Sequence, residues 1–276
     1  MPEAVPAWDR EALLAAPAFG AVQPLLARLA DDGFPELDAL NAIAAERGVE
    51  SGGGRALRFV AAQKSAGAPE RPYEARVYET GEVPTRPASW HDLFNALAWL
   101  AFPRTKAELN RRHYAELRAR AGQPQRGTAR DVLTLFDEGG MLVACTDASL
   151  AELLRGFRWK ALFWERRDDV RACMRFQVFG HAILENALAL FRGVTAKALI
   201  VAVRTDELAL PTGALNAVLD ARAAEYFARP ESLVSTRALA PLPVLGIPGW
   251  SRENEQPAYY DDAGHFRPGR RGRADA

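Results

Sequence analysis

The pattern that most constrains the fold lies in residues 89–121, where two helices are predicted to meet at a proline. Ser89, followed three residues later by Asp92, is typical of a helix start. The next apolar side chains recur at the spacing of one helix face: Trp90, Leu93, Phe94, Leu97 and Ala101. Pro103 ends this helix, and Thr105 with an acid three residues on repeats the start signal. The sequence therefore predicts two helices joined by a short turn, as a hairpin or a corner.

Elsewhere the patterns alternate between helix and strand. Short helices, interrupted by prolines and glycines, are expected before Gly48. Strands are predicted near 56–62, 73–79, 141–145, 171–179 and 196–204, and helices near 147–163, from 181 onward and near 212–228. Residues 129–138 fit either a helix that leads into a strand or the first arm of a β-hairpin.

These elements predict a helix-rich α+β fold. We expect a single domain over residues 1–266, with a helical segment at 1–50 packed on it. One modest mixed sheet is expected, built from the strands near residues 56, 73, 141, 172 and 196. The basic segment 267–276, RPGRRGRADA, is predicted to be a disordered tail.

The charge balance bears on the kind of partner. Lys and Arg together number 35, as do Asp and Glu, so the formal net charge is zero. A protein dedicated to nucleic acids or to membrane surfaces needs a net basic field, and neither role is expected here. Neither a signal peptide nor a membrane-spanning segment is expected. Cys145 and Cys173 lie in apolar stretches without a CxxC partner and are expected to be free thiols, typical of the reducing cytoplasm.

Histidines on predicted helices are the first candidates for chemistry. His91 and Asn95 lie one turn apart on a second face of the first helix, where buried polar groups need hydrogen-bond partners. Asp92 beside them has a ready role as a helix cap, so a histidine that is simply satisfied in the core is the competing interpretation. His113 lies beside the apolar stripe of the second helix and is open to the same two interpretations.

His181 and Glu185 lie one helical turn apart, just after a predicted strand. This spacing suits a general base with its orienting acid, or two metal ligands. It is also common by chance.

Other polar residues have simpler explanations. Turn chemistry accounts for Asp137 and Glu138, and His265 is expected at the surface. The aromatic-rich segment 245–262 either closes over a pocket or packs as an ordered strap. The sequence contains no GxSxG elbow, no P-loop, no HExxH motif, no paired CxxC motif and no GxGxxG motif after a strand.

Four blocks of sequence resemble a known family: Val83–His113, Arg130–Gly140, Phe179–Glu185 and Leu245–Trp250. Together they are similar to the bacterial family catalogued as domain of unknown function 3025, over about residues 70–267. The resemblance implies a grouping without an established activity. It also implies that certain polar residues fall in the characteristic blocks of the family: His91, Asp92, Asn95, His113, Asp131, Asp137, Glu138, His181 and Glu185.

Two hypotheses of function follow. In the first, the protein is a cytoplasmic enzyme, a hydrolase with or without a divalent metal, that acts on a small-molecule ligand. Its pocket would bring together His91, Asp92, His113, His181 and Glu185 as bases, ligands and orienting acids. In the second, the protein is a non-catalytic binding or scaffold protein, and these groups satisfy one another in the core. The sequence indicates no oligomeric state.

Overall fold

The computed structural model describes residues 7–62, 71–119 and 127–269. The first half of the described chain forms α1 (Arg10–Ala15), α2 (Gln23–Leu26), α3 (Leu37–Glu46), β1 (Arg58–Ala61), α4 (Tyr73–Thr80), β2 (Glu82–Thr85), α5 (Trp90–Ala101) and α6 (Pro103–Ala119). The second half forms α7 (Thr128–Gly139), β3 (Gly140–Cys145), α8 (Ala148–Arg155), α9 (Arg167–Cys173), β4 (Met174–Val178), α10 (His181–Asn186), β5 (Thr195–Ala202), α11 (Thr205–Leu208), α12 (Thr212–Ala228) and β6 (Ala240–Pro243). Short 3₁₀ turns and a π-helical turn at Ala161–Glu165 connect these elements.

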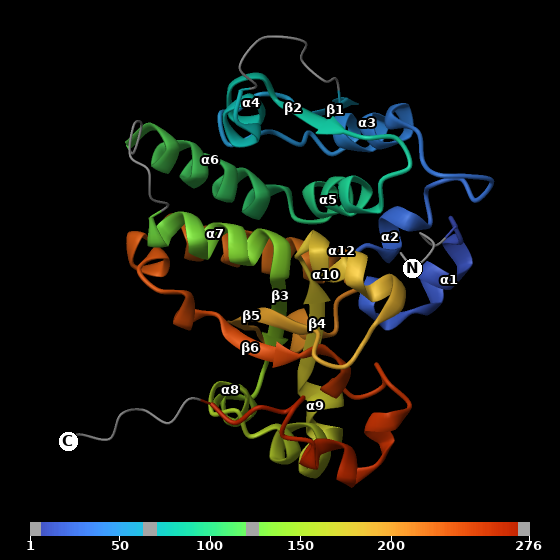
Figure 1. Ribbon diagram of the computed structural model, residues 1–276, viewed down its shortest axis with the longest axis vertical. Coiled ribbons are helices and arrows are strands. Elements are labelled where there is room, and N and C mark those ends of the chain that lie inside the picture. Colours follow the sequence, from blue (N-terminus) through green and yellow to red (C-terminus); the bar gives the residue numbers. More distant parts are fainter. Residues whose placement is uncertain (1–6, 63–70, 120–126, 270–276) are drawn as a thin grey trace.

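The elements are stacked in tiers along the long axis (Figure 1). At the top of that view lie α3, α4, β1 and β2, with α5 and α6 beneath them. A middle tier contains α7, α10 and α12, and the sheet of β3 to β6 lies below it, above α8 and α9. The predicted helix-rich α+β class is confirmed.

Two sheets are present in the described residues, where one was predicted. The larger has the order β4-β3-β5-β6 and is mixed, because β3 pairs parallel to β5 while β4 and β6 are antiparallel edge strands. The strand predicted near residue 56 does not join it. That strand, β1, pairs instead in parallel with β2, an extended segment that contains Pro84. The two strands frame α4 as a small β-α-β unit, which keeps them apart from the larger sheet.

The strand predicted at residues 73–79 is wrong, because this segment is helix α4. Its apolar residues alternate as in a strand, yet Tyr73 and Val77 are also one helical turn apart. Gly81 closes the helix in the left-handed conformation, at φ 74°. Packing on α6 favours the helix: Tyr78 stacks on Tyr114 with ring centroids 3.9 Å apart.

The predicted helix pair is present as α5 and α6, and a single residue separates the two helices. Ser89 caps α5 as expected, since its hydroxyl accepts the backbone N–H of Asp92. Thr105 does not start α6, which begins at Pro103. The free N–H groups of its first turn donate instead to the carboxylate of Asp220, on α12. A residue 115 positions away in the chain thus caps this helix.

Of the two alternatives for residues 129–138, the helix is found, followed directly by β3. The strand predicted at 171–179 is shorter than expected, because α9 occupies its first residues. The segment 245–262 packs as an ordered strap, in which the buried Asn254 donates to the carbonyl groups of Leu245 and Ile247. The predicted tail overlaps residues 270–276, which lie outside the described residues.

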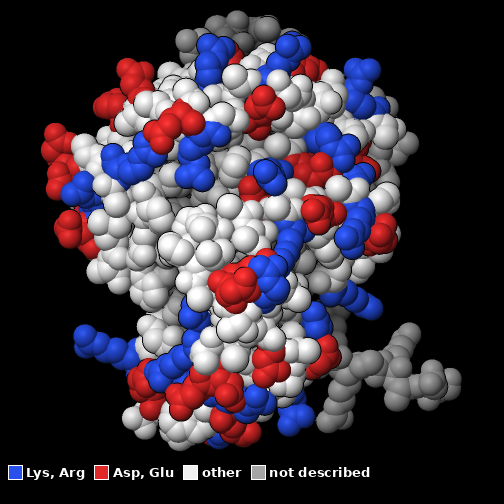
Figure 2. Space-filling view, turned by 180° about the vertical axis from the view of Figure 1, so that it is seen from behind, with Lys and Arg blue, Asp and Glu red and all other residues white. Residues whose placement is uncertain are grey.

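Within the described part of the chain, no helix has the length and apolar character required to cross a membrane. On the face seen in Figure 2, acidic and basic side chains are interspersed around an uncharged area.

Candidate functional site

A pocket of about 540 Å³ opens between helices α4, α5 and α6 on one side and α7 with the start of α10, in the middle tier, on the other. Most of its lining side chains are polar: Tyr73, Glu74, Arg86, His91, Asp92, Asn95, His113, Arg130, Thr134, Asp137, Glu138 and His181. Concave sites with a few convergent polar groups are the usual location of ligand binding.

The predicted site residues meet at this pocket. Four of them, His91, Asp92, His113 and His181, line it, although the first and last are 90 positions apart in the chain. The fifth, Glu185, is bonded to His91 at 2.9 Å. The geometry therefore has the convergence that the enzyme hypothesis requires, while the roles of these residues remain predictions.

His91 and Glu185 form a histidine–carboxylate pair. The distance from His91 Nδ1 to Glu185 Oε2 is 2.9 Å, and both side chains are partly exposed. With the proton on Nδ1 donated to the carboxylate, Nε2 of His91 is left with a lone pair. His181 lies edge-on to the His91 ring, with centroids 4.6 Å apart. This is the arrangement of a general base with its orienting acid.

A buried ion pair lies behind His181. Lys106 is 3% exposed, and its Nζ donates to Asp137 Oδ1 at 2.5 Å and to Asn95 Oδ1 at 2.9 Å. Burial favours the neutral form of Asp137, but the charge and hydrogen bond of Lys106 outweigh it and hold the pKa of this carboxyl below its usual value. Asp137 therefore remains negatively charged at neutral pH.

His181 is a neutral imidazole in this setting. Its Nδ1 is buried and lies 3.9 Å from Asp137 Oδ2, too far for a hydrogen bond. Burial lowers the pKa of His181 to about 4, and the nearby Lys106 charge acts in the same direction, against the opposing effect of Asp137. At neutral pH, His181 can donate or accept a hydrogen bond without carrying charge.

Glu74 has the opposite shift. Burial in the pocket, with the negative charge of Asp137 nearby, raises the pKa of the Glu74 carboxyl to about 7. Asn110 Nδ2 donates to Glu74 Oε2 at 2.8 Å and to the Glu74 carbonyl at 2.9 Å, which fixes the side chain in place. Two carboxyl groups whose pKa values are displaced in opposite directions are typical of sites with separate acid and base roles.

Asp92 has a structural role at the rim of the pocket. Arg86 donates to both of its carboxylate oxygens, each at 2.8 Å, and the Arg86 backbone N–H donates as well. Despite the opposing effect of burial, these bonds hold the pKa of Asp92 below its usual value. Asp92 thus fixes the segment before α5.

Glu74 and Lys106 were not predicted as site residues. A strand at 73–79 would place Glu74 on the face opposite the apolar residues, where a solvent-exposed side chain is expected. Because the segment is a helix instead, Glu74 reaches the pocket. Lys106 carried one signal, since it is among the four lysines of a chain that otherwise uses arginine. Asp137 was assigned to a turn, but α7 continues through Gly139 and turns this side chain into the pocket.

Other predicted polar residues lie elsewhere. Asp131 is exposed and does not line the pocket. The prediction of a surface position for His265 is wrong: it is 6% exposed, and its Nδ1 accepts the Gly193 N–H at 3.0 Å. Cys145 is buried, Cys173 is half-buried, and both are free thiols as expected.

A metal site would need several donor side chains that converge on one point. Over residues 7–62, 71–119 and 127–269, no three His, Cys, Asp or Glu side chains are grouped closely enough to hold a metal ion. The His91–Glu185 pair offers two donors.

Comparison with known proteins identifies a family whose description states no function. Residues 57–270 match the family model described as "Protein of unknown function (DUF3025)". This match covers most of the chain and confirms the resemblance carried by the four sequence blocks. No curated protein and no solved structure matches the chain.

Proposed function

We propose that this chain, which belongs to the DUF3025 family of proteins of unknown function, is a hydrolase that acts on a small molecule by general acid–base catalysis. One observation carries the proposal. An oriented imidazole, His91 with Glu185, and a carboxyl group with a pKa of about 7, Glu74, belong to the same pocket. Groups that titrate near neutral pH are the most effective proton donors and acceptors in water.

Water is the nucleophile in this proposal. No Ser or Cys is found among the described side chains that line the pocket. Nε2 of His91 takes a proton from a water molecule as the water oxygen forms a bond to the electrophilic atom of the substrate. The bond to the leaving group breaks, and protonated Glu74 gives its proton to the departing atom. Exchange with solvent then returns His91 to its neutral form and Glu74 to its protonated form.

The remaining residues position these two. Burial and the negative charge of Asp137 favour the protonated form of Glu74, and Lys106 fixes Asp137. Neutral His181 packs against the His91 ring and can donate a hydrogen bond to the substrate. In water-filled surroundings these effects would be weak, but the Lys106 and His181 side chains are only 3% and 8% exposed, so little solvent screens the charges there.

The first test needs no substrate. The Glu74 carboxyl is followed by NMR as the pH is raised, with Glu74→Gln used to assign its signal. A pKa of about 7 is expected, against 4.5 for a solvated glutamate. An ordinary value near 4 to 5 would remove the general acid from the proposal.

The second test measures turnover. Aryl esters, aryl phosphates and aryl glycosides are screened as chromogenic substrates. For any substrate that is hydrolysed, Glu74→Gln and His91→Asn are expected to lower kcat by about 100-fold or more. His265→Asn, a change of a buried histidine outside the pocket, serves as the matched control and retains activity. Hydrolysis that persists in both pocket variants contradicts the assignment.

A non-catalytic binding protein is the second candidate. It is favoured by the mutual satisfaction of Lys106, Asp137 and Asn95, since such pairing also suits a purely structural core. In that case Glu74→Gln changes ligand affinity, and no turnover is found with any member of the panel.

The cellular setting belongs to the same proposal. The free thiols Cys145 and Cys173 suit a reducing compartment, which supports a cytoplasmic location. The proposed partner is a small-molecule substrate, and neither a nucleic acid nor a membrane is included.

A further inference from the structure

Two arginines line the pocket, and they differ in their partners. Arg86 is bonded to Asp92 through two nitrogens. For Arg130, no ion pair with a described acid is found, and its buried Nε has no hydrogen-bond partner, although its charge acts from a distance on the Glu74 carboxyl. A guanidinium offers five donors, and leaving a buried donor unsatisfied destabilises a folded protein. A bound ligand that offers an acceptor to the Arg130 guanidinium would remove this cost.

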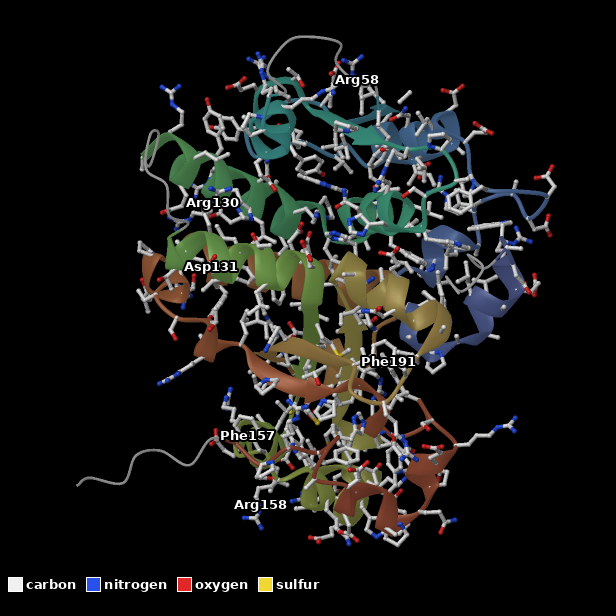
Figure 3. All side chains as sticks on the ribbon, viewed as in Figure 1. Arg58, Arg130, Asp131, Phe157, Arg158 and Phe191 are labelled. Carbon is white, nitrogen blue, oxygen red and sulfur yellow. The ribbon has the colours of Figure 1, made fainter. Side chains whose placement is uncertain are left out.

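The position of Arg130 on its helix points the same way. It lies in the first turn of α7, where the helix dipole favours acidic residues and disfavours basic ones. The neighbouring Asp131 is exposed, whereas Arg130 lies on the α7 surface next to α6 (Figure 3). Neither helix stability nor an ion pair accounts for an arginine in this place.

Arg130 continues a polar stripe along α7. Thr134 is four residues further on, followed by Asp137 and Glu138, and all of them line the pocket. Arg130 and Asp137 are seven residues apart, which corresponds to about 10 Å along a helix axis. The backbone positions of Arg130 and Asp137 are therefore well separated along the α7 side of the pocket.

We propose that Arg130 binds an anionic group of the substrate, a carboxylate or a phosphate, and that the substrate extends along α7 so that its reacting group reaches His91 and Glu74. This inference rests on the proposed function and names the substrate class of that site. The planar guanidinium can donate two parallel hydrogen bonds to either anion.

The test uses inorganic phosphate and acetate as probes of the full-length chain. Each is titrated while the Nε–H signals of the arginines are followed by NMR, and Arg130→Lys assigns the Arg130 signal by removing it. The exposed Arg158, near the opposite end of the molecule, is an internal reference in the same sample (Figure 3). We expect the Arg130 signal to respond to phosphate, acetate or both at a concentration at least tenfold lower than the Arg158 signal does.

A second measurement compares affinities by calorimetry. Arg130→Gln is expected to weaken binding of the responding anion at least tenfold, and Arg158→Gln, which removes the same charge, should leave it unchanged. Arg130→Lys retains the charge without the planar fork and should bind with intermediate affinity. The stronger of the two anions identifies the class of group that is recognised.

Two results overturn the inference: an Arg130 signal that responds no earlier than that of Arg158, or anion binding that survives in Arg130→Gln. Since these readouts need no turnover, they are independent of the catalytic proposal. Anion binding at Arg130 together with an ordinary Glu74 pKa would reject the mechanism and keep the anion site. The reverse pattern would keep the acid–base pair and reject the anion site.

Discussion

At the scale of single residues, the pocket shows how neighbours determine chemistry. Glu74 and Asp137 are both carboxylic acids, and burial acts on both in the same direction. The difference is the Lys106 ammonium group, which bonds to Asp137 directly; on Glu74 its charge acts only from a distance, and the raising effects of burial and of the Asp137 charge prevail there. One buried cation thus sets two protonation states, and two predictions follow from this arrangement.

The first prediction concerns stability and pH. The pKa of Glu74 is raised from 4.5 to about 7 by folding, so the folded carboxyl retains a proton that the unfolded one releases between these values. The free energy of unfolding therefore falls as the pH rises through this window. Glu74→Gln removes the effect, and its stability should exceed that of the wild type by roughly 1 to 3 kcal/mol at pH 8 but not at pH 4.5. Urea unfolding at both pH values measures this; a pH-independent difference would contradict it.

The second prediction concerns the buried ion pair. Lys106→Met leaves the Asp137 carboxylate largely buried without its partner, which we expect to cost about 3 kcal/mol. The double variant Lys106→Met/Asp137→Asn removes both charges and should be less destabilised than Lys106→Met alone. Urea denaturation of the wild type, the single variants Lys106→Met and Asp137→Asn, and the double variant gives the coupling energy. Strictly additive losses would show that the pair does not act as a unit.

At the scale of elements, the helix ends and the joints between helices place the site residues. The chain passes from β4 into α10 at Gly180, so that His181 is the first residue of the helix and faces Asp137 on α7. The fit is close: a Cβ added at Gly180 would lie 2.3 Å from the Glu138 carbonyl oxygen and 2.5 Å from the Gly140 nitrogen. Because these neighbours are backbone atoms, the clash cannot be relieved by rotating a side chain.

The third prediction follows from this joint. Gly180→Ala forces α7 and α10 apart and should lower the free energy of unfolding by about 1 to 3 kcal/mol. It should also shift the NMR signals of the His181 ring, because the ring moves relative to Asp137. Gly213→Ala is the matched control: an added Cβ there meets nothing within 4 Å in helix α12, so stability should hold or rise by up to about 1 kcal/mol. Equal effects of the two substitutions would show that the close contact is unimportant.

At the scale of the whole molecule, the pocket depends on contacts between tiers that are distant in sequence. Asp220 on α12 caps α6 through the backbone N–H groups of Arg104 and Thr105, and its own carbonyl accepts the Thr105 hydroxyl. Helix α6 contributes His113 to the pocket lining and places Lys106 and Asn110 against Asp137 and Glu74. The late part of the chain thereby fixes one wall of a site whose other wall is α7.

The fourth prediction tests this connection. Asp220→Ala removes the acceptor of two backbone N–H groups and should lower the free energy of unfolding by about 2 kcal/mol. Asp220→Asn, which retains one carbonyl oxygen, should lose less. Hydrogen exchange of the Arg104 and Thr105 amides would report the loss locally. Unchanged protection of these amides in Asp220→Ala would show that α6 is held by other contacts.

The sequence alone determined what depends on local spacing. Helix α5 with its Ser89 cap, the break at Pro103 and the α+β class all follow from residues within a few positions of one another. The same holds for the His181–Glu185 spacing. Backbone sterics and the burial of apolar faces act over this range, so a single sequence carries the information.

Only the tertiary structure decided which element type an ambiguous segment adopts and which side chains meet. Residues 73–80 fit strand and helix alike, and packing on α6 selected the helix that brings Glu74 into the pocket. The pKa of Glu74, the pairing of Lys106 with Asp137 and the unpaired Nε of Arg130 all depend on residues distant along the chain. Electrostatic energies vary with distance and burial in three dimensions, and a linear sequence contains neither.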